Sequence, residues 1–335
     1  MKKPHYFQSP VIASSGLMGI VGEGYTYHKI CKILFPFLFS FKWITFQNKT
    51  FTAYEREGNM KLQKVDGITP VDFHPKCIYT NFWKGYAVNN VSLSNPGIYV
   101  VLNMGTLQKI EGELHLSIML TEKEPQKRKE EIIYIVAALK PELKNFKASK
   151  IFLHYNVSCP NTGHDSQKLF LGNFKEEYSF LKLLKLPIFL KVGWDFPIDV
   201  LLQLQESKMI SGVDAINTIP FDELPNFMKM DYFKRDKSGD FISPLDKHQH
   251  LFKVKGRGGV SGNPIRSFAL RWIRKARRKG FILPIIGRGG ILQFWHVLQF
   301  KKVGATAISP GSIAFLRPWN LLLITLTALL IFRKH

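Results

Sequence analysis

The stretch that decides the fold is residues 283–316, LPIIGRGGILQFWHVLQFKKVGATAISPGSIAFL. Its first apolar run, Leu283–Gly287, ends in the glycine turn Ile286-Gly287-Arg288-Gly289-Gly290, and a helical pattern follows over Ile291–Lys302. A second apolar run, Ala305–Ser309, ends in the turn Pro310-Gly311-Ser312. A strand, a glycine turn and a helix that repeat in this order predict parallel strands joined by helical crossovers.

The same alternation extends through the rest of the chain. Further candidate strands are Pro10–Ala13, Trp43–Gln47, Leu114–Leu120, Ile151–Asn156, Pro187–Val192 and Asp214–Thr218. Further helical patterns fall at Pro125–Leu139, Gln167–Leu184, Pro197–Glu206 and Pro264–Lys279. Eight strands in a chain of 335 residues predict an α/β protein folded as a (β/α)₈ TIM barrel, with a doubly wound open sheet as the alternative.

The barrel is expected over residues 1–316, as a single domain with an inserted loop region. The segment 221–255 is long, charged and poor in periodicity, so we expect an excursion on a loop between a strand and a helix. Residues 317–335 are expected to form an apolar C-terminal helix or tail. The apolar run Leu321–Phe332 is shorter than the about 20 residues that span a membrane. It therefore predicts a buried helix, with an anchor at a membrane surface as the alternative.

The composition is that of a folded globular protein with a large positive charge. The chain has 47 Lys and Arg against 25 Asp and Glu, which gives a formal net charge of +22. Such a charge fits nucleic acid, an anionic membrane surface or an acidic substrate. Because the basic residues are spread along the helical segments and form no block, we attribute the charge to a generally Lys-rich composition. No specific nucleic acid is expected.

The three cysteines, Cys31, Cys77 and Cys159, lie far apart and form no C-x-x-C pair. This spacing argues against a zinc site, an iron–sulfur cluster and a disulfide framework, so no metal is expected. The N-terminal residues lead into a polar stretch without a signal-peptide core. A cytoplasmic location is expected, with peripheral membrane contact through the C-terminal tail left open. Assembly as a homodimer is left open as well.

Polar or glycine residues follow the ends of the predicted strands, where barrel enzymes build their active sites. The turns at Gly289 and Gly311 stand where this fold commonly holds a phosphate, because glycine lets backbone N–H groups approach an anion. Lys49 and Lys191 each follow an apolar run. A lysine at the mouth of a barrel needs a partner or a ligand, so the two lysines favour an anionic ligand.

The motif Asn156-Val157-Ser158-Cys159-Pro160-Asn161 stands where another predicted strand ends. Its asparagines offer uncharged donors and acceptors that suit amide, imide or carboxylate groups on a ring. A cysteine beside such a pocket acts as a base or nucleophile when its pKa is lowered. A small buried cysteine without chemistry is the alternative for Cys159 taken alone.

Together these motifs resemble the dihydroorotate dehydrogenase family, from about residue 9 to residue 316. The matches follow the family's order, and they are Ser9–Gly16, Lys49-Thr50, Arg56–Asn59, Asn89, Leu93–Gly97, Asn156–Asn161, Lys191, Asn217-Thr218, Gly258–Gly262, Gly287–Gly290 and Gly311-Ser312. The resemblance implies an FMN-dependent barrel enzyme that oxidises dihydroorotate to orotate in de novo pyrimidine biosynthesis. Cysteine rather than serine at position 159 resembles the soluble class of the family.

The resemblance also implies roles for individual residues. FMN is expected to contact Ser15, Gly16, Lys49, Thr50, Asn89, Asn156, Lys191, Asn217, Gly262, Gly289, Gly290, Gly311 and Ser312, with its phosphate on the last four. The pyrimidine is expected to contact Lys49, Asn89, Ser92, Leu93, Asn156, Asn161, Asn217 and Thr218. The implied catalytic residue is Cys159, which removes a proton from C5 of the substrate while a hydride passes from C6 to flavin N5.

Several residues depart from the family pattern. Ser92 stands where the family usually has glycine, and Ser14, Arg288 and Pro310 are also atypical. These departures bear on the substrate more than on the FMN site, although Arg288 in the phosphate turn is compatible with an anion.

Two alternative functions remain beside this reading. One is a related FMN barrel that acts on another pyrimidine, of the dihydropyrimidine or tRNA dihydrouridine type. The other is a barrel-derived binding protein without catalytic activity. The electron acceptor is open between fumarate, NAD⁺ through a partner subunit, and quinone.

Overall fold

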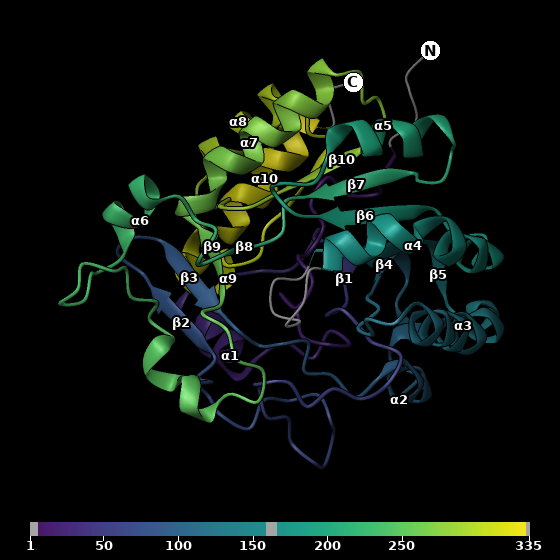
Figure 1. Ribbon diagram of the computed structural model, residues 1–335, viewed down its shortest axis with the longest axis horizontal. Coiled ribbons are helices and arrows are strands. Elements are labelled where there is room, and N and C mark those ends of the chain that lie inside the picture. The colour runs from purple at the N-terminus through teal and green to yellow at the C-terminus, as the bar shows by residue number, and fades with distance from the viewer. Residues whose placement is uncertain (1–5, 159–165, 333–335) are drawn as a thin grey trace.

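The structure, a computed structural model, describes residues 6–158 and 166–332 (Figure 1). Its main sheet has seven strands in the order β1-β4-β5-β6-β7-β10-β11, and each neighbouring pair is parallel. The strands are β1 (Phe46–Gln47), β4 (Gly112–Ile118), β5 (Ala148–Asn156), β6 (Ile188–Val192), β7 (Gly212–Ala215), β10 (Ile285–Arg288) and β11 (Ala307–Ser309). The predicted strands therefore lie where the sequence placed them, with ends shifted by a few residues.

Residues 10–13 close this sheet into a barrel. Val11 pairs in parallel with Ile308 of β11, and Ile12 pairs in parallel with Thr45 beside β1. The N–H of Ile12 donates to the carbonyl of Ile308 (2.9 Å), and the N–H of Ala13 donates to the carbonyl of Thr45 (2.8 Å). An extended segment thus takes the place of the eighth strand. The predicted (β/α)₈ barrel is confirmed, and the open sheet is not.

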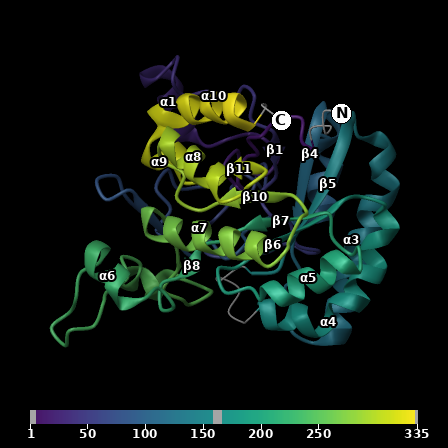
Figure 2. The same cartoon turned by 90° about the horizontal axis from the view of Figure 1, so that it is seen from above.

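Helices cover the outside of the barrel (Figure 2). The longer ones are α3 (Pro125–Glu142), α4 (Ser166–Leu181), α5 (Ile198–Glu206), α7 (Asn263–Arg278), α8 (Phe294–Lys302) and α10 (Leu321–Phe332). On α3, the buried side chains of Ile132, Ile135 and Leu139 share a core with Leu114 and Leu116 of β4. The outward-facing side chains of the strands are thus apolar and are covered by helices, as the crossover pattern predicts.

The helix predicted to open at Ile291 begins three residues later, at Phe294. The Nδ1 atom of His296 accepts a hydrogen bond from the N–H of Leu292 (3.1 Å), and the Asn320 side chain donates to the carbonyl of Leu292 (2.9 Å). These two contacts hold Leu292 outside the helix, so residues 291–293 are not helical and α8 begins at Phe294.

A second sheet, which the sequence did not predict, lies beside the C-terminal ends of the barrel strands (Figure 1). It is antiparallel, in the order β2-β3-β9-β8, and consists of β2 (Ile78–Asn81), β3 (Tyr86–Asn89), β8 (Ile219–Pro220) and β9 (Gly259–Gly262). The segment 221–255 leaves the barrel between β8 and β9 and contains α6 (Asn226–Tyr232) and a 3₁₀ helix (Asp246–Leu251). The remaining α-helices are α1 (Thr26–Leu34), α2 (Ile98–Asn103) and α9 (Ile313–Leu316).

Two sets of side chains fill the inside of the barrel. The first, which we term the apolar layer, is a separate cluster of Phe7, Ile12, Phe152, Phe189, Ile286 and Ala307. Side chains two residues apart on a strand face the same side, so His154 and Arg288 follow Phe152 and Ile286 toward the C-terminal ends of the strands. Both contact Asp214, while His154 also contacts His115 and Arg288 also contacts Gln47. We term this second set, Gln47, His115, His154, Asp214 and Arg288, the polar layer.

Candidate functional site

A cavity of about 510 Å³ lies at the C-terminal ends of the barrel strands, and its size suits a cofactor or a drug-sized ligand. The sequence-predicted residues that line it are Ser15, Gly16, Lys49, Thr50, Asn89, Ser92, Leu93, Asn156, Lys191, Asn217, Thr218, Gly289, Gly290, Gly311 and Ser312. Gly262 stands behind this lining. Cys159 and Asn161 lie outside the described residues. Side chains scattered over some 300 residues of sequence therefore meet in one cavity.

The late glycines form a tightly packed turn at one end of the cavity. Gly289 and Gly290 have φ of +107° and +75°, a conformation that favours glycine. A Cβ atom on Gly290 would stand 2.5 Å from the carbonyl oxygen of Gly262, and one on Gly311 would stand 3.0 Å from the side chain of Ser14. Gly262 thus supports Gly290 from behind. A turn without side chains allows a phosphate to approach the backbone closely, so these residues fit the phosphate of a nucleotide cofactor.

Lys49 lies in the cavity wall, and its ammonium donates to the carbonyl of Ser94. Burial lowers the pKa of Lys49 to about 8, although Cys77 and Glu23 act in the opposite direction. Because the ammonium has few partners and is removed from water, an anionic ligand would stabilise it. A lysine with a shifted pKa in a cavity is typical of a functional site.

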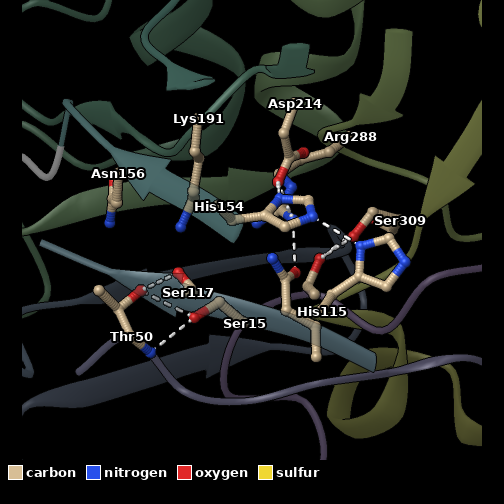
Figure 3. Close-up of polar contacts among 12 residues, drawn as sticks. Ser15, Thr50, His115, Ser117, His154, Asn156, Lys191, Asp214, Arg288 and Ser309 are labelled. Atoms are coloured by element: carbon tan, nitrogen blue, oxygen red, sulfur yellow. Dashed lines mark hydrogen bonds and ion pairs between the residues drawn. The ribbon is translucent and has the colours of Figure 1, made fainter. Parts of the chain in front are cut away.

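Three hydroxyl groups join the loops that carry this lysine. Ser15 Oγ accepts from the N–H of Thr50 (2.8 Å) and lies 2.9 Å from Thr50 Oγ1. Thr50 Oγ1 in turn lies 2.8 Å from Ser117 Oγ on β4. The chain of hydroxyls of Ser15, Thr50 and Ser117 joins the loop after residues 10–13 to the loop after β1 and to β4 (Figure 3).

The asparagines of the cavity are oriented by one another. Asn217 Nδ2 donates to the carbonyl of Ser158 (3.0 Å) and to Asn156 Oδ1 (3.4 Å). Ser158 Oγ donates to the carbonyl of Lys191 (3.1 Å). The two asparagines, Lys191 and the residue directly before Cys159 are thus held together at the ends of β5, β6 and β7.

The unpredicted second sheet delivers another part of the wall. Asn89 ends β3, and its Nδ2 donates to the carbonyl of Gly259 on β9 (3.4 Å). Ser261 of β9 lines the cavity too, although only the glycine-rich stretch around it marks it in the sequence. The second sheet therefore acts as a side wall over the barrel mouth.

Ser92 occupies a backbone position that explains the glycine usual in the family. Ser92 and its neighbour Leu93 have φ of +60° and +61°, in the left-handed region where glycine carries no penalty. Ser92 nevertheless keeps this conformation, is buried and lines the cavity. The surrounding structure therefore holds Ser92 in a backbone conformation that would suit glycine better.

Arg288 points away from the place that its sequence neighbours suggested. It stands in the glycine turn, yet its side chain enters the barrel, where Nη2 lies 2.5 Å from Asp214 Oδ2 and donates to Gln47 Oε1 (3.0 Å). It also lines the cavity, and its residue surface is 6% exposed. The guanidinium is therefore a buried cation below the cavity, held by an acid on β7.

The polar layer is the functional feature that sequence reasoning missed. Its signal is the alternation Phe152, His154, Asn156, in which polar residues stand at positions that face into the barrel. Such interiors are usually filled by bulky branched side chains. A histidine and an acid at inward positions of β5 and β7 could therefore have been noted.

The chain is similar to known proteins over most of its length. A family model described as "Dihydroorotate dehydrogenase" matches residues 3–322. The chain belongs to the dihydroorotate dehydrogenase family. The resemblance carried by the glycine turns, the lysines and the asparagine motif is thereby confirmed, and with it the expectation of an oxidoreductase of this family.

The relatives of this chain include dihydroorotate dehydrogenases whose names refer to NAD⁺ and to fumarate. The chain is 26% identical over 318 residues to the catalytic subunit of dihydroorotate dehydrogenase B (NAD⁺) of Caldicellulosiruptor bescii, covering 93% of this chain and 86% of the relative. It is 30% identical over 234 residues to dihydroorotate dehydrogenase A (fumarate) of Lactobacillus delbrueckii subsp. bulgaricus, covering 68% and 66%.

A solved structure supports the fold. The crystal structure of the Eimeria tenella dihydroorotate dehydrogenase in complex with ferulenol has a TM-score of 0.58 with this chain at 16% identity, covering 97% of this chain and 82% of the other. Within residues 6–158 and 166–332, no helix is both long enough and apolar enough to cross a membrane. The same residues contain no group of three or more His, Cys, Asp or Glu arranged to hold a metal ion.

Proposed function

We propose that the chain oxidises dihydroorotate to orotate with FMN as its cofactor, a step of de novo pyrimidine biosynthesis. The observation that carries this proposal is the single cavity in which the glycine turn, Lys49, Lys191 and the paired asparagines meet. Each of these groups fits one part of the reaction. FMN supplies the hydride acceptor when it is bound, and the chain supplies binding, orientation and the base.

In the proposed complex, the FMN phosphate binds at Gly289, Gly290, Gly311 and Ser312. The close packing of Gly290 on Gly262 supports this assignment, because any side chain at position 290 would collide with backbone. Ser15 and Gly16 lie against the ring, and Thr50, which bonds Ser15, keeps that wall in place. Lys191, at the end of β6, contacts the ring or the ribityl chain.

The substrate lies between the ring and the asparagines. Asn156 and Asn217 present amide donors and acceptors to the pyrimidine, with Thr218, Asn89, Ser92 and Leu93 completing the wall. Lys49 binds the carboxylate, for which its partly desolvated ammonium is suited. Asn161, outside the described residues, is proposed as a further substrate contact from its place in the sequence motif.

Cys159 is proposed as the base that removes the C5 proton. It follows Ser158, which hydrogen bonds hold beside Asn217 and Lys191, so the chain enters the motif from a fixed position. A thiolate near the lysines would gain electrostatic stabilisation, which lowers the pKa of a cysteine and makes it an effective base near neutral pH.

Anaerobic mixing tests this function. The purified protein is expected to be yellow, and dihydroorotate is expected to bleach its flavin absorbance. Cys159→Ser should bleach at least about a hundredfold more slowly at pH 7, because loss of a general base costs about 10²–10⁴ in rate. Ser179→Ala, at an exposed serine on α4 that does not line the cavity, is the control and should bleach like wild type.

Other outcomes of the same experiment distinguish the alternatives. Flavin that binds but stays oxidised with dihydroorotate contradicts the substrate, and bleaching by another dihydropyrimidine would identify a related reductase. A colourless protein that takes up no FMN would favour a barrel-derived binding protein. After bleaching, fumarate, NAD⁺ with a partner subunit, and a quinone are each added to see which restores the oxidised spectrum.

We also propose a cytoplasmic enzyme that contacts an anionic membrane surface peripherally. Apolar side chains of α1, the loop after it and α10 are exposed together, and they are Ile33 (77%), Leu34 (64%), Phe37 (84%), Leu323 (45%) and Leu330 (68%). The N–H of Leu322 bonds the carbonyl of Leu38, which joins these elements. Lys29, Lys32 and Lys42 stand near this face, and basic residues beside exposed apolar ones favour anionic lipid.

Sedimentation with vesicles checks this contact. Vesicles containing phosphatidylserine should bind the protein at low salt, and Phe37→Ser with Leu330→Ser should abolish binding. If the double variant instead converts a dimer into a monomer without changing sedimentation, the face is the interface of a homodimer.

A further inference from the structure

A continuous row of buried polar side chains crosses the barrel below the cavity (Figure 3). Glu113 Oε1 lies 2.9 Å from His115 Nε2, and His115 Nδ1 lies 2.6 Å from His154 Nε2. His154 Nδ1 lies 3.5 Å from Asp214 Oδ2, which is 2.5 Å from Arg288 Nη2. The side chains of His115, His154 and Asp214 are 0% exposed. The row therefore links the floor of the cavity, which Arg288 lines, to the far side of the barrel interior through side chains that are almost completely buried.

The hydrogen atoms available to this row are one too few. A neutral imidazole carries one N–H, so His115 and His154 together supply two. Three contacts need a proton: Glu113 to His115, His115 to His154, and His154 to Asp214. If the first two are made, His154 Nδ1 faces an acceptor, and this atom has no hydrogen-bond partner among the described residues. The pair is thus arranged to accept one more proton, on His154 Nδ1.

The fixed charges around the pair balance without that proton. Glu113 accepts with both oxygens, from His115 and from the N–H of Gln8 (2.9 Å), which is the behaviour of a carboxylate. Burial raises the pKa of Asp214, but Arg288, His154 and Lys191 outweigh this and leave it lowered. Two carboxylates thus face two cations, Arg288 and Lys191.

The other groups near the pair do not change this balance. Lys150 on β5 acts on His115 from the exposed end of the strand, where water screens its charge. Burial raises the pKa of Tyr6, so its hydroxyl stays neutral. Burial also lowers the pKa of His154 to about 4, and it lowers that of His115. The pair therefore lacks the third proton at neutral pH before the cofactor is reduced.

We propose that His115 and His154 form a buried proton-binding site that takes up one proton from water when the cofactor in the cavity accepts a hydride. The inference rests on the proposed FMN-dependent function, because a hydride brings one negative charge into the cavity that Arg288 lines. In a medium of low polarity that charge favours a compensating proton nearby. The new N–H of His154 donates to Asp214, so the row gains its missing hydrogen bond as the charge is neutralised.

The dependence of the flavin midpoint potential on pH tests the proposal. Chemical reduction of the holoenzyme should take up one proton more per two electrons in wild type than in His154→Gln, whose amide cannot be protonated. For a two-electron couple this is about 30 mV more per pH unit, because a tenfold change in equilibrium constant corresponds to 29.6 mV. His28→Gln, at a buried histidine on α1 outside the row, should behave as wild type. Equal slopes in wild type and His154→Gln would overturn the proposal.

A measurement on the wild-type protein avoids any folding defect of the variant. With ¹⁵N-labelled histidine, NMR should show two protonated ring nitrogens in the pair before reduction and three after it, and an unchanged count would overturn the proposal. The two functions fail differently. Flavin that chemical reductants reduce but dihydroorotate does not would contradict the substrate alone, whereas protein that binds no flavin would overturn both.

Discussion

The apolar layer and the polar layer share the inside of the same barrel, yet they are built on opposite principles. In the apolar layer, the rings of Phe7, Phe152 and Phe189 lie within 5.4–5.7 Å of one another, and all are buried. In the polar layer, directly above, every side chain depends on a charged or hydrogen-bonded neighbour. His115 touches both, since its ring stacks on Phe152 at 4.8 Å.

The difference shows how a barrel divides stability from function. Apolar contacts are non-directional, so their energy follows buried area and tolerates changes of shape. A buried ion pair gains little over an apolar pair, but it is costly to break because one charge is then left without a partner. Packing alone thus explains the apolar layer, but it does not explain the ion pairs and hydrogen bonds of the polar layer, which we relate to the proposed function of the cavity above.

The largest effect is expected when one partner of the buried ion pair in the polar layer is removed. Asp214→Leu should lower the free energy of unfolding by about 3–5 kcal/mol, because it leaves Arg288 buried without its acid. Urea unfolding measures the loss. Arg288→Met added to Asp214→Leu should restore most of the stability, and a double variant as unstable as Asp214→Leu would contradict the importance of the pair.

The second largest effect concerns acid. The pKa of His154 is lowered to about 4 from 6.5, so between these values the unfolded chain binds a proton that the folded protein does not. His154 therefore contributes fully to the free energy of unfolding above pH 6.5. This contribution is lost as the pH falls toward 4, by up to about 1.4 kcal/mol per pH unit. Stability measured at pH 7 and pH 5 should fall less in His154→Gln than in wild type, and parallel profiles would contradict this.

A smaller effect is expected at alkaline pH, where Lys49 in the cavity wall loses its charge. Because the pKa of Lys49 is about 8, its charge is largely lost by pH 9, and orotate should bind about tenfold more weakly there than at pH 7. Titration of flavin absorbance with orotate measures the affinity. Lys49→Arg keeps its charge and should show a flat profile over this range, while a sloping one would assign the effect to another group.

The smallest effect is expected in the apolar layer. Ile12→Val should lower the free energy of unfolding by about 1 kcal/mol, because this loss of one buried methylene typically costs about 0.5–1.5 kcal/mol. The flavin potential should keep its pH dependence, because the polar layer above is unchanged. A loss as large as that of Asp214→Leu would show that the two layers do not differ as described.

The sequence predicted the barrel well because strands and crossover helices have different hydrophobic periods. The predicted strand Pro187–Val192, for example, differs by one residue from strand β6 of the structure, Ile188–Val192. The small sheet escaped prediction because β8 has only two residues and all four residues of β2 are partly buried, so neither strand shows a hydrophobic period of two. The predicted start of α8 was wrong because the side chains of His296 and Asn320 hold Leu292 outside the helix. The contact from Asn320 comes from 28 residues downstream, where no local pattern could reveal it.

The site was predictable to a different extent. Residues such as Lys49, Asn156 and Gly290 stand at strand ends or in turns, where a sequence motif marks them. The polar layer depends instead on which residues face one another across the barrel, as Arg288 of β10 faces Gln47 of β1. Such partners are 241 residues apart, and no local pattern joins them.

The closure of the barrel by residues 10–13 has a consequence for how the protein is made. The partner of this segment, Ile308, is synthesised nearly 300 residues after it, which at 5–20 residues per second is roughly 15–60 s. Until then the growing chain exposes unpaired strand edges, which readily associate with other chains. The pairing of this segment with Thr45 can form early, but the pairing with Ile308 that closes the barrel must wait for the end of this interval, so one edge of the sheet lacks its partner while most of the barrel is made.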